Sequence, residues 1–246
     1  MLEKIKSKIR YTNLYFFLLR FTNPKYLDWI NKEFQFHQKF LKKKNKIIFD
    51  LGANRGDKTY IFSKYAEKII AYEPEPKMNF IMKKRFKDKK IIIKNTIVSN
   101  KTGNCNFLIV QGNEAYSTIN KKSLLPFTHL NKNKIKIVNK KSTTLNIEIK
   151  KYGIPEYIKI DCEGAEKKIL SNLKFKVKII SFELNLPYFY NDGKSIINLM
   201  SKKFKCKFNL RIQDQYFFKF KKNINHIKLI KYLKKKKLTA EIFAFS

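Results

Sequence analysis

Four acidic residues stand where short apolar runs of this sequence end: Asp50, Glu73, Asp161 and Glu183. The chain has only 19 Asp and Glu against 55 Lys and Arg, so four carboxylates at such positions are a specific pattern. In a parallel sheet the carboxyl ends of the strands share one edge, and ligands bind at that edge. Carboxylates gathered there can accept hydrogen bonds from hydroxyl groups or take a proton from a substrate.

One lysine belongs with these acids. Lys159 lies two residues before Asp161, and side chains two apart in a strand point to the same face. Burying a lysine without a partner is costly, so we expect an ion pair with Asp161 or Glu183. An ion pair that only stabilises this edge of the sheet is the alternative to a role in catalysis.

The turn after the first apolar run predicts the ligand. Residues 50–59 (DLGANRGDKT) lead from a strand to a helix and hold two of the seven glycines. A dinucleotide-binding loop needs a third glycine for the backbone to approach a pyrophosphate. The missing glycine and the leading acid favour a cofactor with a nucleoside and a cationic amino acid but no phosphate, namely S-adenosylmethionine. The residues expected to bind it in this turn are Asp50, Gly52, Ala53, Asn54 and Gly56.

Glu73 completes the predicted cofactor site. It follows Gly52 by 21 positions, close to the spacing of about 20 at which an acid after the second strand meets ribose hydroxyls. One carboxylate can accept hydrogen bonds from both hydroxyls of a ribose. The alternative is that Asp50 only caps the turn and Glu73 is a solvated loop residue.

The order of the elements predicts an α/β fold with a doubly wound, mostly parallel sheet. We expect a basic helical N-terminal extension, residues 1–45, broken near Asn23-Pro24, and a catalytic domain, residues 46–246. Residues 111–142 are polar and lysine-rich and are expected to be the least structured. The predicted strands are 47–51, 69–73, 91–94, 106–110, 157–160, 179–184, 204–210 and 241–245, and the predicted helices are 59–66, 77–87, a helix opening at 161–166 and ending near 173, 195–203 and 224–236.

Several stretches of the sequence resemble the FkbM family of class I, S-adenosylmethionine-dependent methyltransferases. They are IFDLGANRG at 48–56, IAYEPEP at 70–76, TLN at 144–146, IKIDCEGAE at 158–166 and ISFEL at 180–184. The resemblance implies a seven-stranded Rossmann-like sheet with an antiparallel last strand. It also implies methylation of a hydroxyl, most often on a sugar or a polyketide, and we expect a sugar of a surface polysaccharide or glycolipid.

Methyl transfer to a hydroxyl needs a base that removes the proton as the oxygen attacks in line. We expect Asp161 to be this base, oriented or charge-balanced by Lys159, with Glu163, Glu166 and Glu183 shaping the acceptor pocket. We expect no metal; the alternative is a divalent cation held by Asp161, Glu183 and Asn185, because Mg²⁺ prefers hard oxygen ligands. The remaining expected cofactor contacts are Pro74, Ser99 and Ser117, with Thr118 beside Ser117.

The formal charge of +36 suggests nucleic acid or an anionic membrane as a partner. Only five of the 55 basic residues are arginine, the residue that best reads phosphates and bases, so a dedicated nucleic-acid surface is disfavoured. The motif NLPY at 185–188 resembles the signature of enzymes that methylate the amines of bases, but it follows the fifth strand rather than the fourth. A nucleic-acid methyltransferase is therefore the rival hypothesis, and a non-catalytic basic interaction module is the third.

Two further expectations concern location. The three cysteines, Cys105, Cys162 and Cys206, are odd in number and widely spaced, which favours a reducing cytoplasm. The apolar stretch at 14–19 is too short for a bilayer span of about 20 residues. Residues 1–45 could instead dock peripherally on an anionic inner membrane face, or form a helical cover over the sheet or the acceptor cleft.

Overall fold

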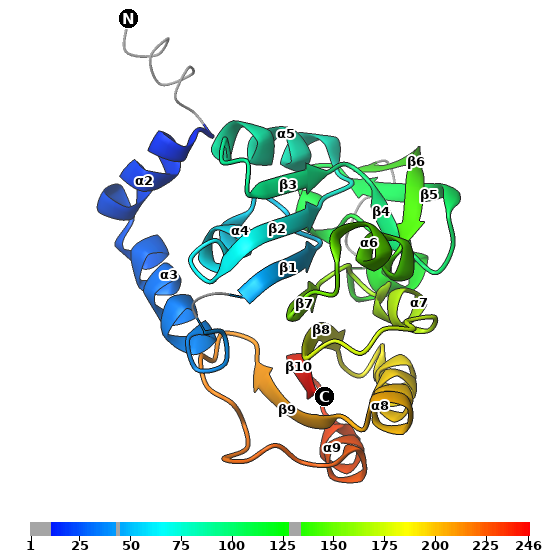
Figure 1. Ribbon diagram of the computed structural model, residues 1–246. Helices are drawn as coiled ribbons and strands as arrows, with labels where there is room; N and C mark the ends of the chain where they lie inside the picture. Colours follow the sequence, from blue (N-terminus) through cyan, green and yellow to red (C-terminus); the bar gives the residue numbers. More distant parts are fainter. Residues whose placement is uncertain (1–10, 43–44, 128–133) are drawn as a thin grey trace, which may run out of the picture.

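The computed structural model describes residues 11–42, 45–127 and 134–246. Helices lie on both sides of a central sheet (Figure 1). The helices are α2 Asn13–Thr22, α3 Pro24–His37, α4 Asp57–Phe62, α5 Pro76–Arg85, α6 Leu145–Tyr152, α7 Glu166–Leu170, α8 Tyr190–Phe204 and α9 His226–Leu233, with 3₁₀ turns η1 Glu114–Tyr116 and η2 Lys121–Phe127. The strands are β1 Asn45–Leu51, β2 Ala66–Tyr72, β3 Ile91–Lys94, β4 Ile97–Ser99, β5 Gly103–Val110, β6 Ile135–Thr144, β7 Tyr157–Ile160, β8 Ile179–Asn185, β9 Lys207–Ile212 and β10 Thr239–Phe245.

Among the described residues, seven strands form the central sheet in the order β3-β2-β1-β7-β8-β10-β9. Strands β3, β2, β1, β7 and β8 pair in parallel, whereas β10 is antiparallel to both of its neighbours. The predicted doubly wound, mostly parallel sheet with an antiparallel last strand is therefore confirmed. The chain order reverses between β1 and β7, and open α/β sheets bind ligands at such a switch point.

The strands are apolar on both faces because helices cover the sheet on both sides. Phe49 of β1 faces the cluster formed with α6, α7 and α8, while the preceding Ile48 faces the cluster that contains α4 and Phe36 of α3. Neither side chain is exposed to solvent. Burial of both faces fixes the register of the strand. The register in turn fixes the positions of the acids at the strand ends.

A smaller sheet, with strand order β4-β6-β5, packs beside the main one. The expectation that residues 111–142 are the least structured is wrong for residues 135–142, because β6 pairs antiparallel with β5 over eight residue pairs. Most side chains in the first part of β6 are only partly buried or exposed, and Ile137 is 56% exposed. A lysine-rich, half-exposed strand of this kind does not have the apolar pattern of a buried strand.

Other boundaries also differ from the prediction. Helix α4 ends at Phe62, before the predicted end, because the chain turns there and enters β2 at Ala66. Helix α6 was not predicted. It begins where the Thr144 hydroxyl accepts a hydrogen bond from the Ile147 backbone N–H, at 3.3 Å, and so caps the helix.

Residues 11–42 form the two helices expected for the extension. The predicted break is confirmed: the Asn23 side chain accepts a hydrogen bond from the Tyr26 backbone N–H at 3.1 Å, and Pro24 occupies the first turn of α3. Phe36 of α3 is fully buried against Phe62 and Phe243. No helix within the described ranges is long and apolar enough to cross a membrane. The rest of the predicted extension, residues 1–10 and 43–44, lies outside the described residues.

Candidate active site at the carboxyl edge of the sheet

The turn after β1 packs directly against the end of β7. Gly52 has a φ of +73°, and a Cβ atom added to it would lie 1.8 Å from the carbonyl oxygen of Asp161. Asn54 is also left-handed, with a φ of 51°. Only glycine fits at position 52, because both the backbone conformation and the close approach exclude a side chain. The two sequence motifs are therefore joined in space by backbone contact.

Glu73 connects the turn after β1 with the turn after β2. Its carboxylate accepts hydrogen bonds from the backbone N–H of Asn54 at 2.6 Å and of Glu75 at 2.8 Å. The side chain is buried, and burial raises the pKa of Glu73 to about 7 despite these two hydrogen bonds. Glu73 is thus not a solvated loop residue. It is a preorganised carboxylate with lone pairs that can still accept hydrogen bonds from a ligand.

A cavity of about 250 Å³ opens beside Glu73. Apolar residues form one part of its lining, and polar residues of the loop between η1 and η2 form another. The lining includes Gly52, Asn54, Glu73 and Pro74 from the first two turns, Ile97, Val98 and Phe107 from the smaller sheet, Ser117 and Thr118 from the loop, and Asp161, Glu163 and Glu183 from the ends of β7 and β8.

Three carboxylates converge in this lining. Asp161, Glu163 and Glu183 each offer a carboxylate oxygen, and these oxygens lie within 4.8 Å of one another. Glu163 has a φ of 51° and is followed by a left-handed Gly164, so the loop after β7 curls sharply. A non-glycine residue in this conformation is strained, which is common at functional sites.

The convergence changes how these acids ionise. Burial, together with the negative charges of Asp161 and Glu166, raises the pKa of Glu163 to about 8. The Asp161 charge, reinforced by burial, raises the pKa of Glu183 well above its usual value. Like charges this close cannot all be ionised at low cost. The cluster therefore retains protons near neutral pH, or it holds a cation, for which hard carboxylate oxygens are suitable ligands.

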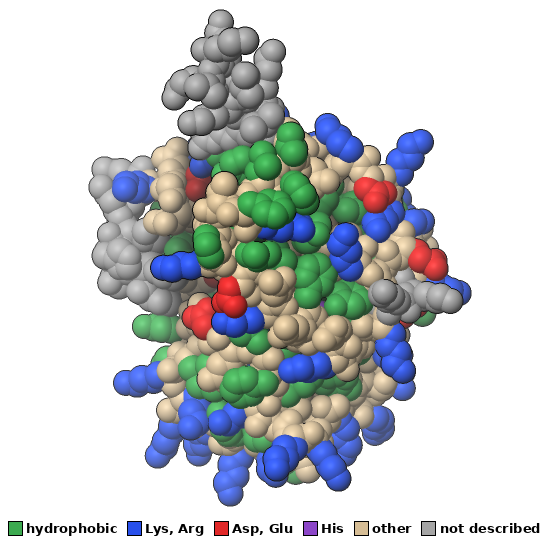
Figure 2. All heavy atoms as spheres, turned by 90° about the vertical axis from the view of Figure 1, so that its left-hand side faces the viewer, with side chains coloured by type: hydrophobic (Ala, Val, Ile, Leu, Met, Phe, Trp, Pro, Cys, Tyr) green, Lys and Arg blue, Asp and Glu red, His purple; other side chains and the backbone are tan. Residues whose placement is uncertain are grey.

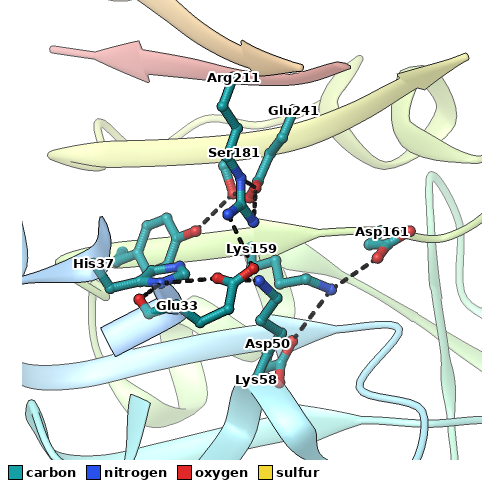
Figure 3. Close-up of polar contacts among 10 residues, drawn as sticks. Glu33, His37, Asp50, Lys58, Lys159, Asp161, Ser181, Arg211 and Glu241 are labelled. Carbon is teal, nitrogen blue, oxygen red and sulfur yellow. Dashed lines mark hydrogen bonds and ion pairs between the residues drawn. The ribbon is translucent and has the colours of Figure 1, made fainter. Parts of the chain in front are cut away.

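Lys159 reaches this cluster from inside the sheet (Figure 3). Its Nζ lies 3.1 Å from Oδ2 of Asp161 and 3.7 Å from Oδ1 of Asp50. The predicted ion pair with Asp161 is confirmed, and the contact with Asp50 was not foreseen. Burial lowers the pKa of Lys159, but the two carboxylates outweigh it and the pKa lies above the usual value.

Three of the expected cofactor residues lie behind the cavity wall. Asp50 is fully buried, and its Oδ2 accepts a hydrogen bond from the Thr59 hydroxyl at 2.6 Å. Gly56 begins α4 with a φ of +86°, and an added Cβ would lie 2.4 Å from the ring of Phe86. Ser99 is buried next to the lining residue Val98. These residues position the turn and the wall, and their contact with a cofactor remains a prediction.

The other expected residues lie on cavity surfaces. Ala53 and Lys159 line a wider cavity of about 560 Å³, which shares Gly52, Asn54 and Asp161 with the first. Ser117 lines the first cavity, where its Oγ accepts a hydrogen bond from the Val110 backbone N–H at 3.2 Å.

Glu166, the remaining acid after β7, stabilises the loop that it belongs to. Glu166 accepts a hydrogen bond from the Cys162 backbone N–H at 2.9 Å, and so holds the curled loop after β7. It lines a small pocket of about 10 Å³ together with Glu163, Glu183 and Asn185. Tyr188, in the turn after β8, is 43% exposed.

Several lining residues escaped the sequence analysis. Thr96 and Gln213 follow soon after β3 and β9, so the rule that residues after parallel strands face the ligand edge could have found them. Trp29 of α3 lines the wider cavity and no sequence pattern indicates it. The N-terminal helices thus contribute directly to the walls around the site.

A second charged cluster joins α3 to the sheet and was also missed (Figure 3). Arg211 of β9 lies 2.6 Å from Glu241 of β10 and 3.0 Å from Glu33 of α3. Lys58 of α4 forms an ion pair with Glu33 as well. Burial raises the pKa of Glu241, but Arg211 and Lys58 outweigh it, and the pKa falls to about 2. This cluster consists of compensated charges, unlike the group around Glu183.

The residues at the edge fit S-adenosylmethionine. Glu73 is a buried acceptor at the position of a ribose-binding acid, and the cavity provides an apolar wall for an aromatic base. The sheet order, the glycine turn and this acid define a class I methyltransferase fold. The profile of the FkbM methyltransferase domain matches residues 50–210, which is well over half of the chain. The chain belongs to the FkbM methyltransferase family and uses S-adenosylmethionine as its cofactor.

The chain is similar to several solved structures. The FkbM methyltransferase from Methylobacillus flagellatus matches with a TM-score of 0.51 at 12% identity, over 87% of this chain and 47% of that one. The chain thus spans about half of that relative. A precorrin 8W decarboxylase from Methanobacterium thermoautotrophicum matches with a TM-score of 0.45 at 10% identity, over 85% and 87% of the two chains. A putative methyltransferase from Streptococcus mutans in complex with SAH gives 0.40 at 11% identity, over 88% and 97%. The last two similarities are too loose to say more about this chain, and no curated protein matches it.

Proposed function

We propose that this methyltransferase transfers a methyl group to a hydroxyl of a sugar, in a surface polysaccharide or a glycolipid. The observation that carries the proposal is the convergence of Asp161, Glu163 and Glu183 within 4.8 Å in the cavity that Glu73 also lines. Carboxyl groups bind hydroxyls well, as acceptors when ionised and as donors when protonated. A cluster of them suits a polyhydroxylated acceptor better than an apolar one.

The cofactor site of the proposal lies at the first two turns. Glu73 would accept hydrogen bonds from the ribose hydroxyls, and Pro74 and Val98 would form part of the wall beside the base. The Gly52 turn leaves room for the amino acid part of the cofactor because it carries no side chain. When bound, the cofactor supplies an electrophilic methyl group on a sulfonium sulfur.

Asp161 is the proposed base. Its carboxylate takes the proton of the acceptor hydroxyl, while Lys159, 3.1 Å away, fixes its orientation from inside the sheet. The raised pKa values of Glu163 and Glu183 favour their protonated forms, in which they donate hydrogen bonds to other oxygens of the sugar. No metal is part of this mechanism.

The proposal also covers the cellular location of the protein and the boundaries of its domains. The protein acts in the cytoplasm, which is supported by three unpaired cysteines, Cys105, Cys162 and Cys206. The proposed N-terminal extension spans residues 1–45, and the proposed methyltransferase domain spans residues 46–246. Trp29 of the extension lines the wider cavity, and this supports a role of the extension in binding the acceptor.

Calorimetric titration with S-adenosylhomocysteine tests the cofactor site. We expect micromolar binding by the parent and a loss of at least about tenfold in Glu73→Ala, because hydrogen bonds to a charged group contribute about 1.5–3 kcal/mol. Glu67→Ala is the matched control, since Glu67 is an exposed acid of β2, the strand that Glu73 follows. Equal binding by Glu73→Ala and the parent would remove Glu73 from the site.

Transfer of labelled methyl groups then tests the acceptor class. Purified glycans and glycolipids are compared with RNA and DNA under the same conditions. Labelling of saccharides supports the proposal. Labelling of nucleic acid alone would replace it with the rival nucleic-acid methyltransferase, and binding without any transfer would favour a non-catalytic module.

A further inference from the structure

Helix α2 is apolar on two opposite sides. Phe16 is 2% exposed and packs into a cluster with Ile30 and Ile81, so one side faces the protein. On the other side a row of large apolar residues faces solvent. This row, the outer stripe, consists of Leu14, Phe17, Leu18 and Phe21, with exposed fractions of 52%, 49%, 41% and 72%.

The spacing of the outer stripe makes it a continuous surface. Positions i, i+3, i+4 and i+7 lie on the same face of a helix. The rings of Phe17 and Phe21 contact each other edge to face, with centroids 5.2 Å apart. A surface helix normally carries polar residues on its outer face, and a contiguous exposed apolar patch marks an interaction surface.

Helix α3, the neighbour of α2, does not have such a row of apolar residues on its exposed side. The exposed side of α3 carries an ion pair between Asp28 and Lys32, at 2.7 Å, and its apolar residues Ile30 and Phe36 are buried. Helix α3 is thus an ordinary amphipathic helix packed on the body of the protein. The outer stripe belongs to α2 alone, so the two helices of the extension have different tasks.

Positive charge surrounds the outer stripe. Residues 11–42, the described part of the extension, contain five Lys and Arg against two Asp and Glu, a net charge of +3. Helix α5, which packs against α2, has the exposed Lys83 and the partly exposed Lys84 in its last turn. Figure 2 shows hydrophobic side chains gathered on this side of the molecule, with Lys and Arg side chains among and around them.

An apolar stripe within a basic surface identifies the partner by its chemistry. A second copy of the chain would bring the same positive charge, and the formal charge of +36 opposes such an association. A bilayer that contains anionic lipids offers an apolar interior below a negative surface, which complements both features.

We propose that α2 docks on anionic membranes, with the outer stripe inserted among the lipids and the surrounding lysines at the headgroups. Met78, which packs against the buried side of α2, also lines the wider cavity of about 560 Å³. Docking through α2 therefore brings this cavity close to the membrane. This inference goes beyond the proposed function, because it does not depend on the identity of the acceptor.

Co-flotation with vesicles tests the docking. We expect the parent to float with vesicles of phosphatidylcholine plus about 30% phosphatidylglycerol, and hardly with phosphatidylcholine alone, because the surface potential attracts basic segments. Salt at about 0.5 M should weaken binding by screening the charges. The double variant Phe17→Ser/Phe21→Ser should lose at least about tenfold in partitioning, since it removes the inserted apolar groups.

The matched control is Ile227→Ser, a change at an apolar residue of α9 that is 65% exposed and lies far from α2 (Figure 1). It should float like the parent. Unchanged affinity for S-adenosylhomocysteine would show that the double variant is folded. The inference is overturned if the parent does not bind the anionic vesicles, or if the double variant binds as well as the parent. It is also overturned if light scattering without vesicles shows a dimer that the double variant abolishes.

Discussion

Glu183 and Glu241 are the same residue type in directly opposed positions of two neighbouring strands, yet their environments differ. The register of β8 and β10 pairs Glu241 with Glu183. Glu241 contacts Arg211 and the Ser181 hydroxyl, and its pKa falls to about 2. Glu183 lies beside Asp161 and Glu163, and its pKa is raised well above the usual value.

The difference separates a structural cluster from a reactive one. Buried carboxylates with cationic partners hold elements together, as Glu33 and Glu241 do for α3 and β10. Partly buried carboxylates that face one another, as Asp161, Glu163 and Glu183 do, have perturbed ionisation and favour binding a proton, a cation or a hydroxyl. The two clusters meet where Glu183 of β8 pairs with Glu241 of β10.

The largest effect is expected from breaking the structural cluster. Arg211→Met leaves two buried carboxylates, Glu33 and Glu241, without their shared cation, so we expect a loss of about 3–5 kcal/mol in the free energy of unfolding. Urea denaturation measures it. Lys167→Ala, which removes an exposed ion pair with Asp192, is the control and should cost less than about 1 kcal/mol. Similar losses in both variants would contradict the comparison.

The second prediction concerns the reactive cluster. Asp161→Asn should lower turnover by about a hundredfold, because general base catalysis contributes at this scale, while affinity for S-adenosylhomocysteine stays nearly unchanged. Asp192→Asn, at a partly exposed acid that lines none of the cavities described above, should keep full turnover. Unchanged turnover in Asp161→Asn would remove Asp161 from the mechanism.

Opposite pH dependences of stability should follow from the two clusters. Glu241 has a lowered pKa, so its contribution is present above the unfolded value near 4.5 and is lost as the pH falls towards about 2. Glu163 has a raised pKa, so its contribution is present below about 4.5 and is lost as the pH rises through about 8.

Glu163→Gln separates these contributions. In the parent, the free energy of unfolding should decline between about pH 4.5 and pH 8. In Glu163→Gln this decline should be smaller, by on the order of 1 kcal/mol, whereas the loss of stability below about pH 4.5 should be unchanged. Urea denaturation across this pH range measures both limbs. An unchanged decline would show that Glu163 does not titrate abnormally.

The smallest effect is expected from chelation. Because the proposed mechanism uses the protons of Glu163 and Glu183, EDTA should leave turnover within about twofold. A loss that Mg²⁺ restores would instead assign Asp161, Glu163 and Glu183 to a metal site.

Much of the reactive edge could be predicted from sequence, because strand ends and glycine turns have local patterns. The positions of Glu73 and Asp161, and the pairing of Lys159 with Asp161, follow from residue spacing and strand alternation. The same alternation places Asp50 beneath the turn, a detail that residue type alone does not indicate.

The structural cluster could not be predicted in this way. Glu33 and Arg211 are 178 positions apart, and their contact depends on how α3 docks on the sheet. Strand β6 was missed for a different reason, since its half-exposed face tolerates lysines that hide the strand pattern. Local rules describe elements well, but they do not indicate which distant charges share a buried site.

The ion pairs of Arg211 also constrain how the gene can change. Glu33 belongs to the N-terminal helices, whereas Arg211 and Glu241 belong to the last two strands of the sheet. An exchange of the first 45 residues with an unrelated segment would leave Arg211 with one carboxylate fewer and expose the face that Phe36 covers. Such an exchange is therefore expected to destabilise the last two strands, although a break near residue 45 would look harmless in the sequence.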